Sequence, residues 1–187
     1  MIYLVGGAPR AGKSILGQRI STKMKIGWIS TDVLMELLRA KNVEGMKVEW
    51  NAAPEEIAAI AEWFFPCLER FVWSISAMAE SYVIEGVHFL PAQVAQLSEQ
   101  YQIRSVFLGC SKMTLEHFNQ FGCSRGYATL PEEIRRQIVQ DIPLWSEFIR
   151  QEAECFGYPY VDMIDDFPSC LKEADAVLTT DRVPENG

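Results

Sequence analysis

The stretch Gly7-Ala8-Pro9-Arg10-Ala11-Gly12-Lys13-Ser14 decides the fold of this 187-residue chain. It satisfies the pattern G-x-x-x-x-G-K-[S/T], in which glycines shape a tight loop that ends in a lysine and a hydroxyl. The apolar run Ile2 to Val5 precedes the stretch, and a helical pattern begins at Lys13. The stretch therefore has the strand, loop and helix setting that a phosphate-binding loop requires.

The residues of this loop suit the phosphates of a nucleotide. Glycines let the main chain approach the β- and γ-phosphates, while successive N–H groups and the start of a helix attract the negative charge. Lys13 would place its charge across the β/γ bridge, and the Ser14 hydroxyl would coordinate Mg²⁺. We expect the following residues to bind the nucleotide: Gly7, Ala8, Pro9, Arg10, Ala11, Gly12, Lys13, Ser14 and Ile15.

Short apolar runs alternate with helical patterns along the chain. The predicted strands are Ile2–Val5, Ile26–Ile29, Tyr82–Ile84, Ile103–Leu108 and Tyr158–Val161. The predicted helices are Lys13–Lys25, Val33–Ala40, Pro54–Ala79, Pro91–Gln100, Lys112–Phe121, Pro131–Phe156 and Phe167–Asp175. Strands that are apolar on both faces are typical of a parallel sheet with helices on each side. We therefore expect an α/β fold, with one domain over residues 1–180 and a flexible tail over 181–187.

Two of the predicted helices contain an internal proline, Pro66 and Pro143. Proline removes a backbone donor and clashes with the preceding turn, so each helix should break or kink there. The segment Thr129 to Glu132 has the spacing of a capping box, which predicts a helix start. The aromatic-rich stretch Pro54–Ala79 is apolar almost all round, as is typical of a buried helix pair. Alternatively, its aromatic side chains form a homodimer face or a wall of a substrate pocket.

Acidic residues follow two predicted strands, and the carboxyl ends of parallel strands meet at a ligand crevice. Asp32 could accept a proton from an acceptor hydroxyl or hold a magnesium-bound water, and it could also cap the next helix. Glu85 ends the third strand and would complete a magnesium site with Ser14. Gly86 would let the chain turn sharply after the strand. His88, two residues later, either contacts a substrate or has a structural role.

An arginine between two glycines follows the fourth strand and its helix, in the segment Gly122-Cys123-Ser124-Arg125-Gly126. We expect a lid over about residues 121–136. The Arg125 guanidinium would stabilise the charge on a transferring phosphoryl group, and closure would exclude water.

The overall charge excludes some classes of partner. With 17 basic and 25 acidic residues the chain carries a net charge of -8, the wrong sign for nucleic acid or an anionic membrane.

The sequence also bears on localisation. Its start has no basic region typical of a signal peptide, and charged residues interrupt its longest apolar stretch. Its 5 cysteines are dispersed, which is typical of reduced thiols. We expect a cytoplasmic protein.

Three pieces of the sequence resemble P-loop small-molecule kinases, whose fold is that of nucleoside monophosphate kinases. They are the loop ending in Ser14, the segment Ile29-Ser30-Thr31-Asp32 with Leu37-Leu38-Arg39 after it, and the segment Ile84 to Pro91. The likeness is greatest to 2-phosphoglycerate kinase-like proteins.

The resemblance implies a three-layer fold with strand order 2-3-1-4-5, together with ATP and Mg²⁺. It also implies transfer of the γ-phosphoryl group to a hydroxyl or phosphate of a small anionic metabolite. Catalytic roles fall to Lys13, Asp32 and the lid residue Arg125. Acceptor binding falls to Asp32, Arg39, Glu85, Gly86 and His88, with Arg39 as an anion clamp.

The identity of the acceptor stays open. The same class includes toxin kinases that act on nucleotide sugars, antibiotic phosphotransferases, and shikimate- or gluconate-type kinases. A different interpretation is a nucleotide-binding ATPase switch or accessory protein. The sequence contains no N-K-x-D motif, which a GTPase switch would use to recognise guanine.

Overall fold

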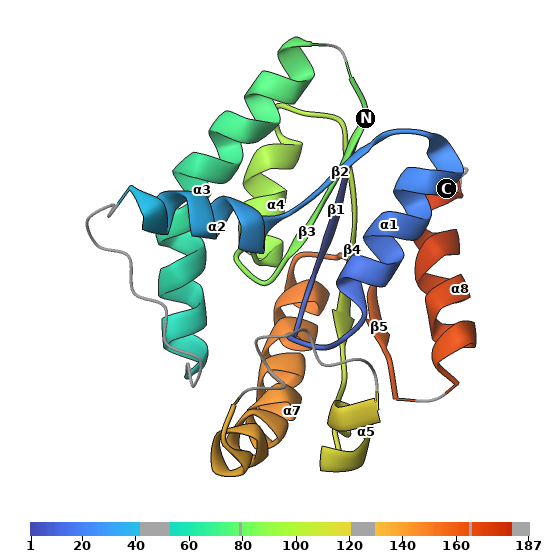
Figure 1. Ribbon diagram of the computed structural model, residues 1–187. Coiled ribbons are helices and arrows are strands. Elements are labelled where there is room, and N and C mark those ends of the chain that lie inside the picture. Colours follow the sequence, from blue (N-terminus) through green and yellow to red (C-terminus); the bar gives the residue numbers. More distant parts are fainter. Residues whose placement is uncertain (42–52, 79, 121–129, 165, 181–187) are drawn as a thin grey trace.

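The computed structural model describes residues 1–41, 53–78, 80–120, 130–164 and 166–180. In these ranges the strands are β1 Ile2–Gly7, β2 Gly27–Ser30, β3 Tyr82–Gly86, β4 Ile103–Gly109 and β5 Tyr160–Asp162. The helices are α1 Lys13–Met24, α2 Thr31–Ala40, α3 Pro54–Ala77, α4 Pro91–Ser98, α5 Leu115–Gln120, α7 Glu132–Cys155 and α8 Phe167–Thr179. The strands pair in parallel in the order β2-β3-β1-β4-β5 (Figure 1). Both the α/β class and the strand order are confirmed.

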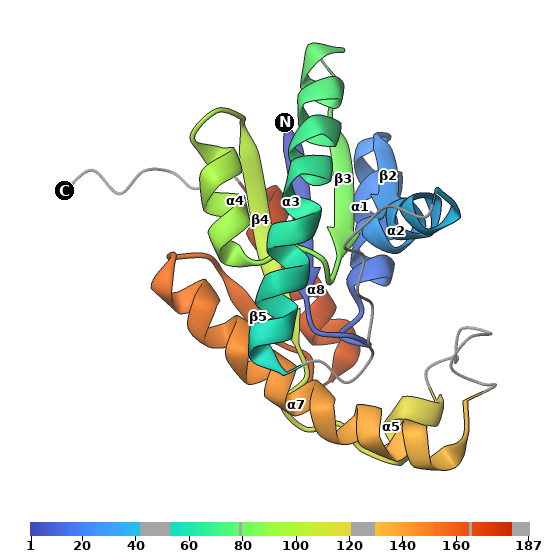
Figure 2. The same cartoon turned by 90° about the vertical axis from the view of Figure 1, so that its left-hand side faces the viewer.

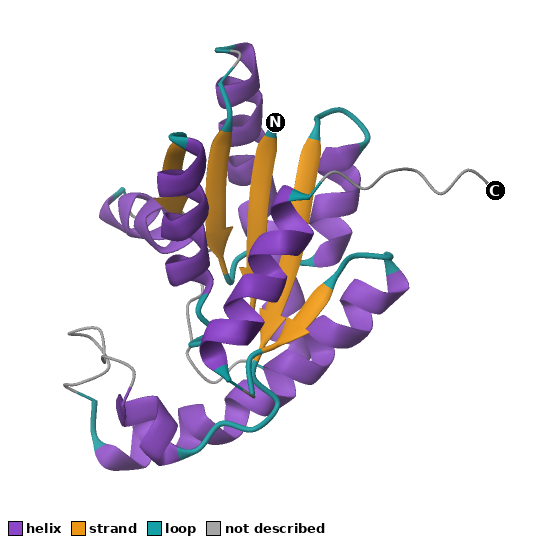
Figure 3. Cartoon of the chain, turned by 90° about the vertical axis from the view of Figure 1, so that its right-hand side faces the viewer, coloured by secondary structure: helices purple, strands orange, loops and turns teal. Residues whose placement is uncertain are grey.

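Helices cover both faces of the sheet, as Figures 2 and 3 show from opposite sides. Leu4 of β1 packs in a cluster with α3, α4 and α7, whereas its neighbours Tyr3 and Val5 pack with α1 and α8. All residues of β1 are buried. The apolar character of both strand faces, visible in the sequence, therefore reflects a central strand between two helical layers.

The register of the strands brings three chain segments to one edge of the sheet. Glu85 of β3 lies opposite Val5 of β1 on one side and opposite Ser30 of β2 on the other. The glycine-rich loop leaves β1 two residues after Val5, and α2 begins directly after Ser30. Glu85 is thus positioned between the loop and the start of α2.

The two internal prolines do not break their helices. α3 runs through Pro66 and α7 through Pro143, so 54–77 is one helix rather than a pair. A proline in a helix costs about 3 kcal/mol, but burying each Phe or Leu side chain contributes about 1.5–3 kcal/mol. Phe64 and Leu68 flank Pro66 and are both fully buried, so their packing outweighs the cost.

The predicted capping box before α7 is wrong. The N-cap is Pro131 and makes no side-chain cap hydrogen bond, so Glu132 is the first helical residue. Thr129 lies outside the described residues, as do Arg125 and the tail 181–187. Of the predicted lid, residues 132–136 form the first turns of α7. Among the helices described, none has the length and apolar character needed to cross a membrane.

Candidate active site

Close backbone approaches fix the glycine-rich loop between β1 and α1. Gly7 has φ 138°, and a Cβ atom there would lie 2.0 Å from the carbonyl oxygen of Leu108 in β4. Gly12 has φ 85°, and its Cβ would lie 2.9 Å from the ring of Phe167. The Ala8 amide donates a 2.8 Å hydrogen bond to the same Leu108 oxygen. Both glycines of the sequence pattern are therefore required by the conformation and by the space.

Lys13 folds back over this loop. It is the first residue of α1, only 7% of it is exposed, and its Nζ donates a 2.7 Å hydrogen bond to the carbonyl oxygen of Ala8. Burial lowers the pKa of Lys13, and the negative charges of Glu85 and Asp32 partly oppose this. The ammonium group is thus held at the loop, at the position where the pattern places a phosphate-binding charge.

A side-chain hydrogen bond joins Ser14 and Glu85. The Ser14 hydroxyl donates a 3.0 Å hydrogen bond to Oε1 of Glu85, which is 2% exposed. No group of three or more His, Cys, Asp or Glu side chains that could hold a metal occurs in the described part of the chain. Mg²⁺ commonly takes one or two protein oxygen ligands and completes its shell with phosphate and water. The Ser14–Glu85 pair fits that requirement.

Asp32, like Glu85, is close enough to Lys13 to affect its pKa, but it is not a helix cap. The N-cap of α2 is Ser30, whose hydroxyl accepts a 3.3 Å hydrogen bond from the Asp32 amide. The Asp32 side chain is 73% exposed, and its Oδ1 lies 3.7 Å from Nδ1 of His88. The cap hypothesis for Asp32 is wrong because the helix begins two residues earlier than predicted, at Thr31 rather than Val33. Its carboxylate is therefore exposed and takes no part in a helix cap.

His88 follows β3 and is 8% exposed. Its Nδ1 lies 2.8 Å from Oγ1 of Thr31, and its ring centroid lies 5.7 Å from that of Phe64 in α3. Burial lowers the pKa of His88 to about 4; Asp32 opposes the shift, and the positive charges of Lys13 and Arg39 add to it. The imidazole is therefore neutral at pH 7.

Gly86 leaves space for a neighbouring side chain at the end of β3. A Cβ atom at this residue would lie 1.7 Å from Oγ1 of Thr31. Gly86 does not have a positive φ, and the chain bends directly after it, at Val87 and His88. The lack of a side chain at Gly86 lets the start of α2 pack closely against the end of β3.

Arg39 and Arg10, two further basic residues predicted to bind ligands, have different partners. Arg39, in the last turn of α2, forms an ion pair with Glu36, and both side chains are exposed. Arg10 has φ 63°, and its Nη2 donates a 2.9 Å hydrogen bond to the carbonyl oxygen of Phe118 in α5. Its guanidinium carbon also lies 5.1 Å from the centroid of the Phe118 ring. Arg10 thus contributes backbone to the loop while its side chain contacts α5.

The remaining residues predicted to bind the nucleotide differ in their solvent exposure. Ala8 and Ala11 are fully buried, Pro9 is buried, and Ile15 is 49% exposed. Sequence reasoning missed Thr31, although its position directly after a strand was a usable signal. It also missed Phe118, since nothing local distinguishes this residue from other core aromatics. Phe64 was covered only by the alternative that aromatic side chains of 54–79 form a wall of a substrate pocket.

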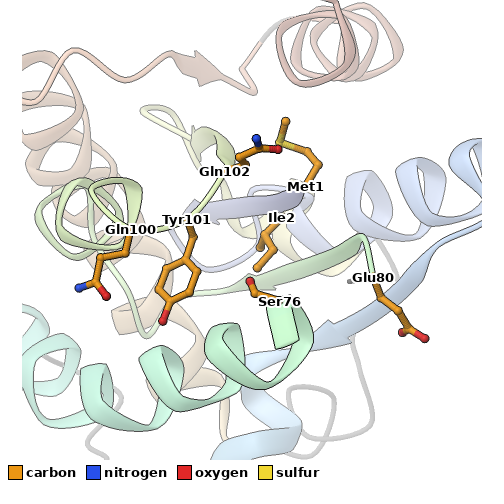
Figure 4. A pocket seen from close by; sticks show the side chains of 7 residues that line it. All are labelled: Met1, Ile2, Ser76, Glu80, Gln100, Tyr101 and Gln102. Atoms are coloured by element: carbon orange, nitrogen blue, oxygen red, sulfur yellow. The ribbon is translucent and has the colours of Figure 1, made fainter. Parts of the chain in front are cut away.

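A cavity of about 240 Å³ lies at the opposite edge of the sheet (Figure 4). It is lined by Met1, Ile2, Ser76, Glu80, Gln100, Tyr101 and Gln102. Apart from Ser76, which is in the last turn of α3, these residues lie directly before or at the start of β1, β3 or β4, whereas the glycine-rich loop follows a strand. The cavity is therefore separate from the site described above.

No family model matches the sequence, and no curated protein matches it. Solved structures do match. A gluconokinase from Sinorhizobium meliloti 1021 superposes with a TM-score of 0.54 at 20% identity, covering 94% of this chain and 90% of its own. A shikimate kinase from Bacteroides thetaiotaomicron gives a TM-score of 0.56 at 14% identity, covering 95% and 98%.

The chain has the fold of P-loop small-molecule kinases. A shikimate kinase from Aquifex aeolicus vf5 agrees, with a TM-score of 0.50 at 14% identity over 95% of this chain and 96% of its own. At these identities the likeness concerns the fold alone. The resemblance to 2-phosphoglycerate kinase-like proteins stays a prediction.

Proposed function

We propose that the protein is an ATP-dependent kinase that transfers the γ-phosphoryl group to a hydroxyl or phosphate of a small anionic metabolite. The supporting observation is the convergence of Lys13, Ser14 and Glu85 at one edge of the sheet, with Asp32 beside them. Lys13 and Ser14 belong to the loop pattern, whereas Glu85 comes from β3 and Asp32 from the start of α2. The kinase fold supports the same conclusion.

The loop and Lys13 would bind the phosphates. The N–H groups of the loop and the N-terminus of α1 provide positive potential, and Lys13 would exchange the Ala8 carbonyl for a phosphate oxygen. Ser14 and Glu85 would hold Mg²⁺, which when bound neutralises charge on the β- and γ-phosphates. The buried Glu85 carboxylate also keeps the Ser14 hydroxyl oriented across the crevice.

Asp32 is the proposed general base. A carboxylate can accept the proton of an acceptor hydroxyl if that hydroxyl lies within hydrogen-bond reach, and Asp32 is exposed enough to be approached. Arg39 lies seven residues further along α2, which is about two helical turns and so the same face. Its guanidinium would leave Glu36 to bind a phosphate or carboxylate of the acceptor.

The test is acceptor-dependent ADP formation across a panel of phosphoglycerates, sugar acids, nucleotides and aminoglycoside-like compounds. Wild-type protein should form ADP with at least one acceptor, and Lys13→Ala should abolish this without unfolding the protein. Lys172→Ala, an exposed lysine on α8, is the matched control and should behave as wild type. Full turnover in Lys13→Ala would overturn the proposed mechanism. ATP hydrolysis that no acceptor stimulates would favour a nucleotide switch.

A further inference from the structure

A single buried hydrogen bond joins the two segments that border the proposed acceptor crevice. Oγ1 of Thr31, the first residue of α2, lies 2.8 Å from Nδ1 of His88, in the loop between β3 and α4. Thr31 is fully buried, and His88 nearly so. Gly86 makes room for this contact, because any side chain there would overlap the Thr31 hydroxyl.

In the Thr31–His88 hydrogen bond, the donor can be identified from the hydrogen-bonding capacity of the two groups. A threonine hydroxyl has one proton to donate, whereas a neutral imidazole has one donor and one acceptor nitrogen. Within the described ranges, the hydrogen bond to Nδ1 is the one recorded for Thr31 Oγ1. A buried donor left without an acceptor costs about 1–3 kcal/mol. The Thr31 hydroxyl therefore donates, Nδ1 accepts, and the ring proton resides on Nε2.

The Asp32 carboxylate opposes the tautomer with the proton on Nε2, but only weakly. Its carboxylate lies 3.7 Å from Nδ1 and would favour a proton there. However, the Asp32 side chain is 73% exposed, so solvent screens its charge, whereas the Thr31 hydroxyl is out of contact with solvent. The other charges that reach the ring, Lys13 and Arg39, are positive and disfavour a second proton on it. From α3, Phe64 presents only an apolar ring.

Nε2 of His88 is open to a ligand. Within the described residues, the hydrogen bond of His88 is made by Nδ1, and none is made by Nε2. Among the described residues, the side-chain polar atoms that are both buried and unpartnered are Trp28 Nε1, Ser105 Oγ, Arg135 Nε and Asp141 Oδ2. Nε2 is not in that set, so the small exposed part of His88 includes this nitrogen.

We infer that His88 is a neutral imidazole that presents Nε2–H as one fixed hydrogen-bond donor to an oxygen of the acceptor, and that Thr31 holds it in that tautomer. The identity of the ligand rests on the proposed kinase function. Such a donor favours a substrate that places a hydroxyl, carbonyl or carboxylate oxygen next to Nε2. It disfavours a substrate that places an N–H group at the same position. It also leaves proton abstraction to Asp32.

Nitrogen NMR of the full-length protein tests the tautomer without any assay of activity. The chain has 2 histidines, so labelled histidine gives two ring systems, and His117→Gln assigns them. Long-range proton–nitrogen correlations should show His88 as the Nε2–H tautomer, still neutral at pH 6. An Nδ1–H tautomer in the wild-type protein would overturn the inference. So would a His88 ring that is already protonated at pH 6.

Two substitutions of Thr31 test its part. Thr31→Ser keeps the hydroxyl and should keep the tautomer, whereas Thr31→Val removes the hydroxyl at nearly constant shape and should give a mixture of tautomers. An unchanged tautomer in a folded Thr31→Val protein would show that Thr31 does not set it.

The role in acceptor binding has its own readout. Once an acceptor is found, Thr31→Val should raise its KM about two- to tenfold, the range expected for one hydrogen bond, and leave the KM for ATP unchanged. If the tautomer shifts but the acceptor KM does not, the inferred contact with the acceptor is wrong. The loss of ADP formation in Lys13→Ala tests the kinase proposal separately, so the two failures are distinguishable.

Discussion

Arg10 and Phe118 link the glycine-rich loop to α5 across 108 positions of sequence. The Arg10 guanidinium donates a 2.9 Å hydrogen bond to the Phe118 carbonyl oxygen and lies over the Phe118 ring. Arg10 makes this contact from a left-handed backbone conformation, with φ 63°, which non-glycine residues adopt at a cost of about 1 kcal/mol. The side-chain contact therefore stabilises a loop conformation that the residue itself disfavours.

Two substitutions of Arg10 distinguish the stabilising effect of its contact with Phe118 from the cost of its positive φ. Arg10→Ala and Arg10→Gly both remove the guanidinium, but glycine tolerates the positive φ and alanine does not. We expect both variants to be less stable than wild type, and Arg10→Ala to be less stable than Arg10→Gly by up to about 1 kcal/mol. Urea unfolding measures the difference. Equal stabilities of the two variants would show that backbone strain at Arg10 is negligible.

Ser14 should control the requirement for Mg²⁺. Ser14→Ala removes the hydroxyl that faces Glu85, whereas Ser14→Thr retains one and still satisfies the loop pattern. We expect Ser14→Ala to need a higher Mg²⁺ concentration for half-maximal ADP formation, and Ser14→Thr to stay near wild type. The measurement is a Mg²⁺ titration at saturating ATP. An unaltered Mg²⁺ dependence in Ser14→Ala would remove Ser14 from the metal site.

Asp32 should affect turnover and not stability. Loss of a general base typically lowers kcat about 10²- to 10⁴-fold, so Asp32→Asn should fall in this range with little change in the KM for ATP. Its exposed side chain caps no helix, so the free energy of unfolding should change by less than about 0.5 kcal/mol. Ser30→Ala is the contrasting variant, because it removes the actual cap and should cost about 1 kcal/mol. Destabilisation by Asp32→Asn at normal turnover would reverse these roles.

Asp175 ties α8 to α1 and should make stability depend on pH. Oδ2 of Asp175 lies 2.8 Å from Nε of Arg19, and Oδ1 lies 2.8 Å from Nζ of Lys23. Burial raises the pKa of Asp175, but the hydrogen bond from Lys23 and the charges of Lys23 and Arg19 outweigh it, so the net pKa is lowered. A lowered pKa in the folded state means that the ionised form stabilises the fold.

Asp175→Asn should therefore reduce the free energy of unfolding by about 1–2 kcal/mol at pH 7, since both cations are partly exposed. The difference from wild type should be constant above about pH 5, where an unfolded aspartate is also ionised, and should shrink as the pH falls below about 4. Chemical unfolding at a series of pH values measures this. Asp166→Asn is an unsuitable control because Asp166 caps α8, so the exposed Glu173→Gln serves instead. A difference that persists unchanged at pH 3 would contradict the ionic explanation.

The sequence was sufficient for the parts of the fold that depend on local pattern. The loop from Gly7 to Ser14 and the apolar strand runs predicted the β-α order, because a central parallel strand must be apolar on both faces. Glu85 and Asp32 could be placed beside the loop because they end or follow neighbouring strands. The strand order itself came from the family resemblance.

The parts that were wrong or missed depend on contacts between distant residues. Pro66 stays inside a continuous helix because Phe64 and Leu68 are buried on either side of it, and sequence alone does not show that burial. The Thr31–His88 hydrogen bond spans 57 positions. The sequence pattern indicates that a helix begins within a few residues of Thr31, but it does not indicate which side chain accepts the proton of the Thr31 hydroxyl.

The Lys13 ammonium has a neutral resting partner, the Ala8 carbonyl, and burial lowers its pKa. A phosphate that replaced that carbonyl would put an anion against the amine and raise its pKa again. At alkaline pH, where part of the amine is neutral, binding would then draw a proton from solution. The heat of nucleotide binding would change with the ionisation enthalpy of the buffer, so calorimetry in two buffers would count that proton.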